Sequence, residues 1–433
     1  MTRLLNSSLS ASLLRNSFIQ VIWWAIFFPG FYSADSFAVL NMAKTGNLNS
    51  YWTSPWAVIV RNLSLHGTQP GLVTLFFSII LSVSMTVFFY SLLSQKNAAL
   101  VSAILQATPL VGAMGITLWH DIPMTSGLLL ITTYVIKSNK FNAYTFNEAI
   151  KFLFPGMVLI TFRGNGLPTI LILFFLLYLL HKKRQGKRIL SVGILLSIAM
   201  TLSSNSLLPD TKFKDFELAT GWIIYDISCY ASTPAGQGFV ERELPGIGTT
   251  AKWSSSSACL WFSDAKLTTA DMAQARGLLT SALFKLIQED PKFLLTTHLK
   301  RHEYLVPLPI FGLVKPPFIH STIEFPEMGV SWAFPSLAEK VRAVIRAWNF
   351  GSFVFAYAGF WLLCIAFSWF FSRRNEILYV LIVSLILNLS LFVFAGISDA
   401  RYALFTLISG QGLVLSHLLQ RLRAFQESSN DQK

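Results

Sequence analysis

The sequence predicts an all-α polytopic membrane protein with about ten transmembrane helices and a mixed or mainly helical domain on the outer face. Of 433 residues, 53% are hydrophobic and 13% are charged, whereas a soluble domain carries about 25% charged residues. Apolar runs of about 17–25 residues recur, and each is long enough to cross about 30 Å of hydrocarbon. The distribution of basic residues then assigns each connection to one side of the bilayer.

The net charge of +13 lies in the short connections between apolar runs. Residues 207–349 hold 14 basic and 14 acidic residues, which leaves 20 basic and 7 acidic residues elsewhere. An excess of Lys and Arg in short loops is typical of cytoplasmic connections. The charge therefore indicates topology and gives no reason to expect nucleic-acid binding.

Residues 1–206 are predicted to form an N-terminal membrane region of about seven spans. Arg3 and Arg15 precede the first span and place the N-terminus inside, so that residues 33–70 form the first outer loop. The expected spans are Ser17–Tyr32, Gly71–Leu93, Ala98–Trp119, Ile122–Ile136, Glu148–Phe162, Leu167–Leu180 and Ile189–Leu207.

Residues 207–349 are long enough to form an extracytoplasmic domain, with helical patterns over Asp271–Gln288 and on through His302. Residues 350–420 are predicted to add three spans, and residues 421–433 a polar, disordered cytoplasmic tail. These last spans are Phe350–Phe371, Ile377–Ile397 and Ala403–Leu419. The expected location is the plasma (inner) membrane, with both termini cytoplasmic.

Two of the three cysteines, Cys229 and Cys259, lie in the predicted outer domain. An oxidising outer compartment would allow a bridge between them. Two free thiols fit the sequence as well, because the sequence does not give their geometry.

Three of the seven acidic residues outside residues 207–349 fall where predicted spans meet the outer face: Asp35, Asp121 and Asp399. Carboxylates beside hydrocarbon are costly and usually mark function. Arg163 and Arg401 lie on the same face. This set predicts phosphate-linked chemistry on a lipid-borne substrate at the outer surface, facing the periplasm or cell exterior.

Asp35 follows the first span, and it is the candidate catalytic residue. A carboxylate at this position could act as a general base that takes the proton of an acceptor hydroxyl. The competing interpretation is that Asp35 caps a short amphipathic helix over Ser36–Ala43.

Asp121 is a candidate substrate-binding residue, and with the adjacent His120 it is a candidate ligand pair for a divalent cation. Mg²⁺ or Mn²⁺ would suit a carboxylate together with phosphate oxygens. Asp two residues before a proline also favours a turn, which is the plain structural alternative.

Arg163, Asn165 and Arg401 are the candidate phosphate ligands, and Asp399 completes the substrate-binding set. Guanidinium groups match phosphate geometry, and the glycines around Asn165 let backbone amides approach an anion. Alternatively, Arg401 forms a structural ion pair with Asp399 while Arg163 extends toward the interface.

His298 and His302 stand four residues apart and would share a helix face, a spacing found in metal ligands. No zincin pattern accompanies them. We therefore expect an ordinary solvated or headgroup-facing surface here.

The arrangement resembles the GT-C superfamily of integral-membrane glycosyltransferases and is closest to an uncharacterised bacterial branch. Those proteins carry an acidic residue after the first span, which Asp35 matches, and a second acid in a later outer loop, which Asp121 matches. The elements that carry the resemblance are Trp119-His120-Asp121, Phe162-Arg163-Gly164-Asn165-Gly166, Tyr225-Asp226-Ile227, Asp290-Pro291-Lys292 and Asp399-Ala400-Arg401-Tyr402. The outer domain departs from the pattern because it lacks the Trp-Trp-Asp motif of oligosaccharyltransferases.

The resemblance implies a polyprenyl-phosphate-linked sugar as donor, inversion at the anomeric carbon, and a glycan, lipid or protein as acceptor. The alternatives are a transporter or flippase of a lipid-linked or anionic substrate, a polysaccharide polymerase or ligase of another membrane family, and a non-catalytic assembly protein. A transporter would place ionisable groups near the midplane and show repeat symmetry. The predicted spans are nearly free of charge and show no repeat.

Overall fold

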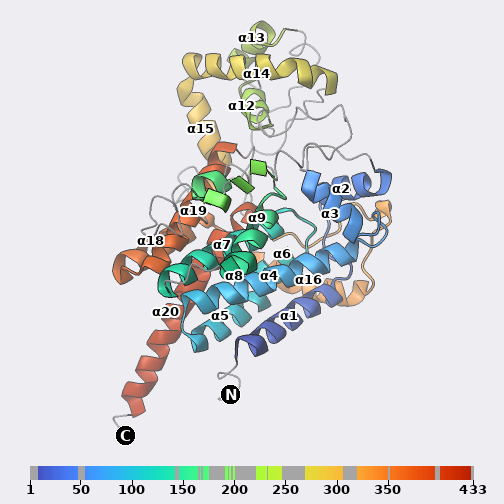
Figure 1. The fold of residues 1–433 in the computed structure, drawn as a ribbon. Coiled ribbons are helices and arrows are strands. Elements are labelled where there is room, and N and C mark those ends of the chain that lie inside the picture. The colour runs from blue at the N-terminus through green and yellow to red at the C-terminus, as the bar shows by residue number, and fades with distance from the viewer. Residues whose placement is uncertain are drawn as a thin grey trace.

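The computed structural model describes most of the chain as helix. The residues it describes are 8–46, 54–141, 146–163, 166, 169–174, 191–193, 195–196, 198–199, 221–231, 233–245, 269–305, 319–349, 352–394 and 400–430. Within these ranges the only extended pairings are two isolated β-bridges, so the predicted all-α class is confirmed. Figure 1 shows an oblique bundle of helices with a smaller helical layer, α12–α15, at one end.

The N-terminal part of the bundle is built on α4, the most apolar of its long helices. Its long neighbours α1 and α7 are less apolar, and α1 carries a buried polar stripe of Ser12, Asn16 and Gln20 at four-residue spacing. The elements are α1 (Leu9–Ile26), α2 (Ala34–Thr45), α3 (Ser54–Leu63), α4 (Pro70–Leu92), α5 (Gln95–Ala107), α6 (Pro109–Gly115) and α7 (Asp121–Phe141).

The predicted third span, Ala98–Trp119, is broken. The chain bends by 67° between α5 and α6, and Pro109 opens α6. Proline lacks the backbone N–H that would continue the ladder and clashes with the preceding turn. A single straight helix is therefore the wrong prediction for this segment.

Helices α7 and α9 cross at a pair of glycines. The second of these helices follows α8 (Phe146–Glu148) and the π-helix η3 (Ala149–Leu153), and itself spans Phe154–Ile160. A Cβ atom on Gly127 would lie 2.5 Å from the Gly156 carbonyl oxygen, and one on Gly156 would lie 2.8 Å from that of Gly127. Small residues permit such close backbone approach. This contact brings the end of α9, which precedes Arg163, toward the start of α7.

The C-terminal part of the bundle comprises α17 (Ser352–Phe355), α18 (Ala358–Ser372), α19 (Asn375–Phe394), the 3-10 turn η6 (Ala400–Ala403) and α20 (Leu404–Asn430). Helix α20 continues through residues that the sequence assigns to a disordered tail. The prediction of disorder is therefore wrong as far as Asn430. A helix that begins with a packed apolar face can continue into polar residues, because each added residue extends an existing hydrogen-bond ladder.

Three helices in the described ranges are long and apolar enough to cross a membrane: Pro70–Leu92, Asn375–Val393 and Ala400–Ser429. The bent pair α5–α6 makes a fourth if it counts as one span. This falls short of the predicted ten. Helices Ala149–Ile160 and Ala358–Ser372 are apolar but shorter, and more than half of the residues of each of the predicted spans Leu167–Leu180 and Ile189–Leu207 lie outside the described residues.

The predicted outer domain divides into two differently packed parts. The first has its own apolar core, around Ile227, Phe239 and Leu283, and consists of α12 (Gly221–Ala231), α13 (Pro234–Glu243), α14 (Thr269–Glu289) and α15 (Pro291–Arg301). The second, residues 319–349 with α16 (Pro335–Asn349), packs into the main core through Ile319, Ala338 and Ile345. In Figure 1 the far end of α20 lies opposite to α12–α14.

Candidate functional site

The chain before α2 is held from both sides by backbone hydrogen bonds. Residues 31–32 form parallel bridges with Thr117 and with Ile323. The bonds are Phe31 N–H to Ile116 O at 3.2 Å, Leu118 N–H to Phe31 O at 3.1 Å, Tyr32 N–H to Thr322 O at 3.0 Å and Glu324 N–H to Tyr32 O at 2.9 Å. Three segments distant in sequence therefore fix the position of Asp35.

Helix α2 is capped by Ser33, not by Asp35. The Ser33 N–H donates to Ser36 Oγ at 3.1 Å, and Ser36 Oγ donates to the Leu118 carbonyl at 2.9 Å. Asp35 stands in the first turn of the helix. The alternative interpretation of Asp35 as the cap is therefore wrong, and its carboxylate is available for other contacts.

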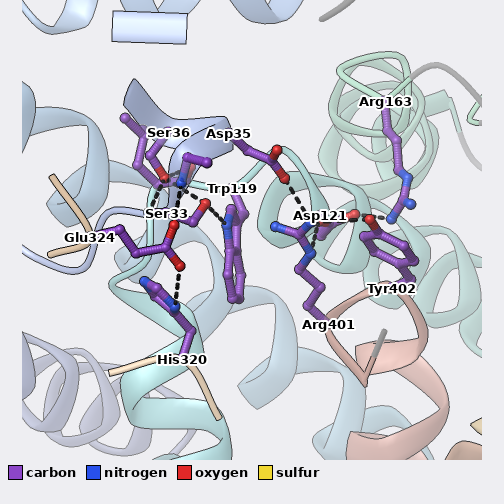
Figure 2. A network of polar contacts seen from close by, with 12 residues as sticks. Ser33, Asp35, Ser36, Trp119, Asp121, Arg163, His320, Glu324, Arg401 and Tyr402 are labelled. Atoms are coloured by element: carbon purple, nitrogen blue, oxygen red, sulfur yellow. Dashed lines mark hydrogen bonds and ion pairs between the residues drawn. The ribbon is translucent and has the colours of Figure 1, made fainter. Parts of the chain in front are cut away.

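The structure brings together four of the predicted charged residues from four separate segments of the chain (Figure 2). Arg401 Nη2 lies 2.6 Å from Asp35 Oδ2, and Arg401 Nε lies 3.7 Å from Asp121 Oδ2. Arg163 Nη1 pairs with the other oxygen of Asp121. We call Asp35, Asp121, Arg163 and Arg401 the outer charge cluster.

Aromatic rings cover both guanidinium groups of this cluster. The Arg163 guanidinium carbon lies 3.9 Å from the centre of the Tyr402 ring, and that of Arg401 lies 4.4 Å from the Trp119 ring. Such cation–π contacts strengthen where water is excluded. The indole N–H of Trp119 donates to Ser33 Oγ at 2.8 Å, which connects the ring over Arg401 to the cap of α2.

Burial distinguishes the two acids of the outer charge cluster. The Asp121 side chain is 1% exposed, whereas that of Asp35 is 33% exposed. Asp121 Oδ2 has no hydrogen-bond partner in the described part of the chain. Asp35 is thus the carboxylate that a substrate can reach, and Asp121 holds the two arginines in place.

His320 and Glu324 adjoin the cluster, and no sequence pattern indicated either residue. Glu324 Oε2 accepts the Ala34 N–H at 2.7 Å, at the start of α2, and its Oε1 lies 3.6 Å from His320 Nδ1. Burial first, and then the charge of Arg401, lowers the pKa of His320 to about 4. No local motif marks these residues, since they reach Asp35 only through the bridge of residues 322–324 to Tyr32.

The arrangement does not fit a divalent cation at His120 and Asp121. Both oxygens of Asp121 face guanidinium groups, which would repel a metal ion. Burial, together with Arg163 and Arg401, also lowers the pKa of His120 well below its usual value. In the described ranges no three His, Cys, Asp or Glu side chains gather as a metal site would require.

Three other predicted residues are not placed by the structure. Asn165 and Asp399 lie outside the described residues, and so does Cys259. Cys229 is disulfide-bonded, while Cys364 is a free thiol.

A second buried charge cluster joins the helical layer α12–α15 to the bundle. Arg301 on α15 pairs with Asp226 on α12, and His298 Nδ1 lies 3.3 Å from the other oxygen of Asp226. His298 Nε2 lies 2.6 Å from the carbonyl oxygen of Phe392 on α19. We call Asp226, His298 and Arg301 the clamp cluster.

The clamp cluster contradicts the expectation of an ordinary surface at His298 and His302. Their rings stack with centroids 4.4 Å apart, and His302 is fully buried. Burial lowers the pKa of His298. The four-residue spacing correctly placed both rings on one face, but that face packs against α19.

Comparison with known proteins adds no assignment, since neither a family model nor a curated protein matches the chain. The class of the protein is therefore inferred from its helices and its charge clusters alone.

Proposed function

We propose that the protein is a membrane glycosyltransferase that moves a sugar from a polyprenyl-phosphate donor to an acceptor hydroxyl at the outer face. The observation that carries the proposal is an accessible carboxylate, Asp35, hydrogen-bonded to a buried arginine, Arg401. A second arginine, Arg163, is anchored by the buried Asp121. A carboxylate base for the acceptor and two cations for the donor phosphate thus lie in one cluster.

Arg401 is shared between Asp35 and the incoming donor in this proposal. The described cluster contains two carboxylates and two guanidinium groups, so its formal charge is balanced. A donor phosphate would replace the Asp35 carboxylate at Arg401, because a guanidinium binds phosphate oxygens in the same forked geometry. The exchange releases Asp35 only when donor is present.

The chemical step then follows from the positions of these groups. Asp35 takes the proton of the acceptor hydroxyl while the acceptor oxygen forms a bond to the anomeric carbon. The bond from that carbon to the phosphate oxygen breaks, and its electron pair leaves with polyprenyl phosphate. Arg163 and Arg401 stabilise the charge on the departing phosphate. Attack opposite the leaving group gives inversion.

The proposal includes the topology expected from charge distribution. The outer charge cluster faces the periplasm or cell exterior, both termini are cytoplasmic, and further helices complete the crossing of the plasma membrane. The position of α20's C-terminal end, opposite to α12–α14 (Figure 1), supports this orientation. The acceptor is a glycan, lipid or protein hydroxyl.

A transporter is the second candidate, because the helix pair α5–α6 is bent and lies near buried amides. Asn16 Nδ2 donates to Ser102 Oγ on α5 at 2.9 Å, and the Gln20 amide has no hydrogen-bond partner among the described residues. Broken helices and polar groups between spans are typical of transport pathways.

Transfer of labelled sugar from a polyprenyl-phosphate donor pool tests the proposed function. Membranes would contain wild type, Asp35→Asn or Glu327→Gln at matched levels, the last removing an exposed acid from the segment 319–349. Transfer lost only in Asp35→Asn supports the enzyme. Lipid-linked sugar that crosses the membrane equally in all three, without transfer, favours the transporter.

A further inference from the structure

An apolar groove runs along the bundle, and no member of either charge cluster lines it. Its volume is about 430 Å³, and its walls come from α4, α7 and the segment η3–α9. The wall residues include Ile80, Val83 and Val87 on α4, Leu130 on α7, and Val158 on α9. Val83 and Val158 are also partly exposed on the outer surface of the bundle, so the groove opens sideways.

One wall of the groove is formed by a candidate membrane span. Its α4 wall belongs to Pro70–Leu92, a helix long and apolar enough to cross a bilayer. An apolar groove that opens toward hydrocarbon offers water no hydrogen-bond partners. A lipid chain is therefore the natural occupant.

A lysine at the groove specifies the head group. Lys151 lines the groove, and its side chain is 63% exposed. Its ammonium lies 3.5 Å from Glu148, whose second oxygen lies 3.9 Å from Lys137. Two lysines against one glutamate leave a net positive charge, which attracts the phosphate of an anionic lipid.

The backbone at this point is unusual in a way that builds the groove. Lys151 and Phe152 both belong to the π-helix η3, Ala149–Leu153. Single-turn π-helices are rare and occur frequently at functional sites. Both side chains line the groove, and Lys137 packs over the Phe152 ring at 4.5 Å.

We propose that this groove binds one acyl chain of an anionic phospholipid, with the head-group phosphate paired to Lys151. Lys137 and Lys140, in the last turns of α7, place this end on the cytoplasmic side, whereas Arg163, past the other end of α9, belongs to the outer charge cluster. The lipid site is thus separate from the donor site. The proposed lipid site requires that the protein be embedded in a membrane, as the proposed function states, but it does not require glycosyl transfer.

Native mass spectrometry of the delipidated full chain tests the proposal. The probes are phosphatidylglycerol and phosphatidylcholine with identical chains, offered at equal concentration. Wild type should retain one phosphatidylglycerol in preference. Because one lysine near a membrane phosphate contributes about 1 kcal/mol, Lys151→Ala should reduce that preference roughly fivefold.

Two further variants locate the chain. Val83→Trp should lower retention of both lipids by filling the groove, and the smaller Val83→Phe repeats the test if Val83→Trp fails to fold. Lys96→Ala removes an exposed lysine on the same predicted face, outside the groove, and should behave as wild type. Equal retention of both lipids by wild type, or phosphatidylglycerol retention unchanged by Lys151→Ala or by the folded Val83 variants, overturns the proposal. The readout is lipid retention and involves no sugar transfer, which separates this test from that of the enzyme.

Discussion

The outer charge cluster and the clamp cluster are built from the same pair, a buried aspartate against a buried arginine, yet they differ in what surrounds the pair. In the clamp cluster Asp226 and Arg301 are both 1% exposed, and His298 contacts the Phe392 carbonyl. In the outer charge cluster Arg401 contacts a second, accessible acid, Asp35. A closed pair can only hold helices together, whereas a shared arginine can exchange one partner for a ligand.

The comparison explains why burial of charge alone does not identify a site. Removing one member of a buried ion pair is costly in either cluster, because the other charge is left in a medium of low dielectric. The two clusters differ in whether a member of the cluster is exposed to solvent. Asp35 loses little solvation when it leaves Arg401, while no member of the clamp cluster has a comparable alternative in water.

The largest expected effect on stability is in the clamp cluster. Asp226→Ala should lower the free energy of unfolding by about 3–5 kcal/mol, because Arg301 then stays buried without its counter-ion. The measurement is thermal unfolding of purified protein. Arg342→Ala, which removes an arginine paired at 2.7 Å with the partly exposed Glu339, should change stability by less than about 1 kcal/mol. Similar losses in both variants would erase the distinction between the clamp cluster and a surface pair.

The next effect is a dependence of stability on pH at His320. The folded pKa of about 4 lies below the unfolded value of about 6.5. Between these values the unfolded chain binds a proton that the folded chain excludes. The free energy of unfolding should therefore fall by roughly 3 kcal/mol in total as the pH drops from about 6.5 to about 4. Below pH about 4 the contribution of His320 should not change further.

His320→Gln should remove that part of the slope, measured by urea unfolding across the pH range. The residual slope in the variant would come from other buried histidines such as His298, whose pKa is also lowered. His417→Gln, at an exposed position of α20, provides the control. A slope in His320→Gln equal to that of wild type would mean that His320 is not held neutral beside Arg401.

A smaller effect is expected when the shared arginine itself is removed. Arg401→Ala should weaken donor use by about 10- to 100-fold, since a charge-assisted hydrogen bond to phosphate contributes about 1.5–3 kcal/mol. Its unfolding temperature should fall less than that of Asp226→Ala, because Asp121 keeps Arg163 as a partner. The readout is the donor concentration at half-maximal transfer. An unchanged value would remove Arg401 from the donor site.

Much of the fold could be predicted from local pattern, and the failures have identifiable causes. The predicted spans Gly71–Leu93 and Ile377–Ile397 match α4 and α19 within a few residues because uninterrupted apolar composition suffices there. The break at Pro109 was missed because the apolar run continues through it. The burial of His298 was missed because the partner, α19, lies about ninety residues away in sequence.

The candidate site shows the same division. Topology alone placed Asp35, Asp121, Arg163 and Arg401 on one face, and the structure brings them into contact. Nothing local predicts that Ser33 would cap α2 or that Glu324 would contact Ala34 from 290 residues away. Contacts of that kind depend on tertiary bridges, which no sequence period encodes.

The most direct test of the shared arginine is to measure donor binding and sugar transfer together in Asp35→Asn. Undecaprenyl phosphate is the binding probe, and transfer is measured from the polyprenyl-phosphate donor pool. Removing the carboxylate frees Arg401, so that affinity for the lipid phosphate should rise roughly five- to tenfold while sugar transfer is lost. Affinity and transfer that fall together, or a variant that transfers sugar normally, would contradict the account.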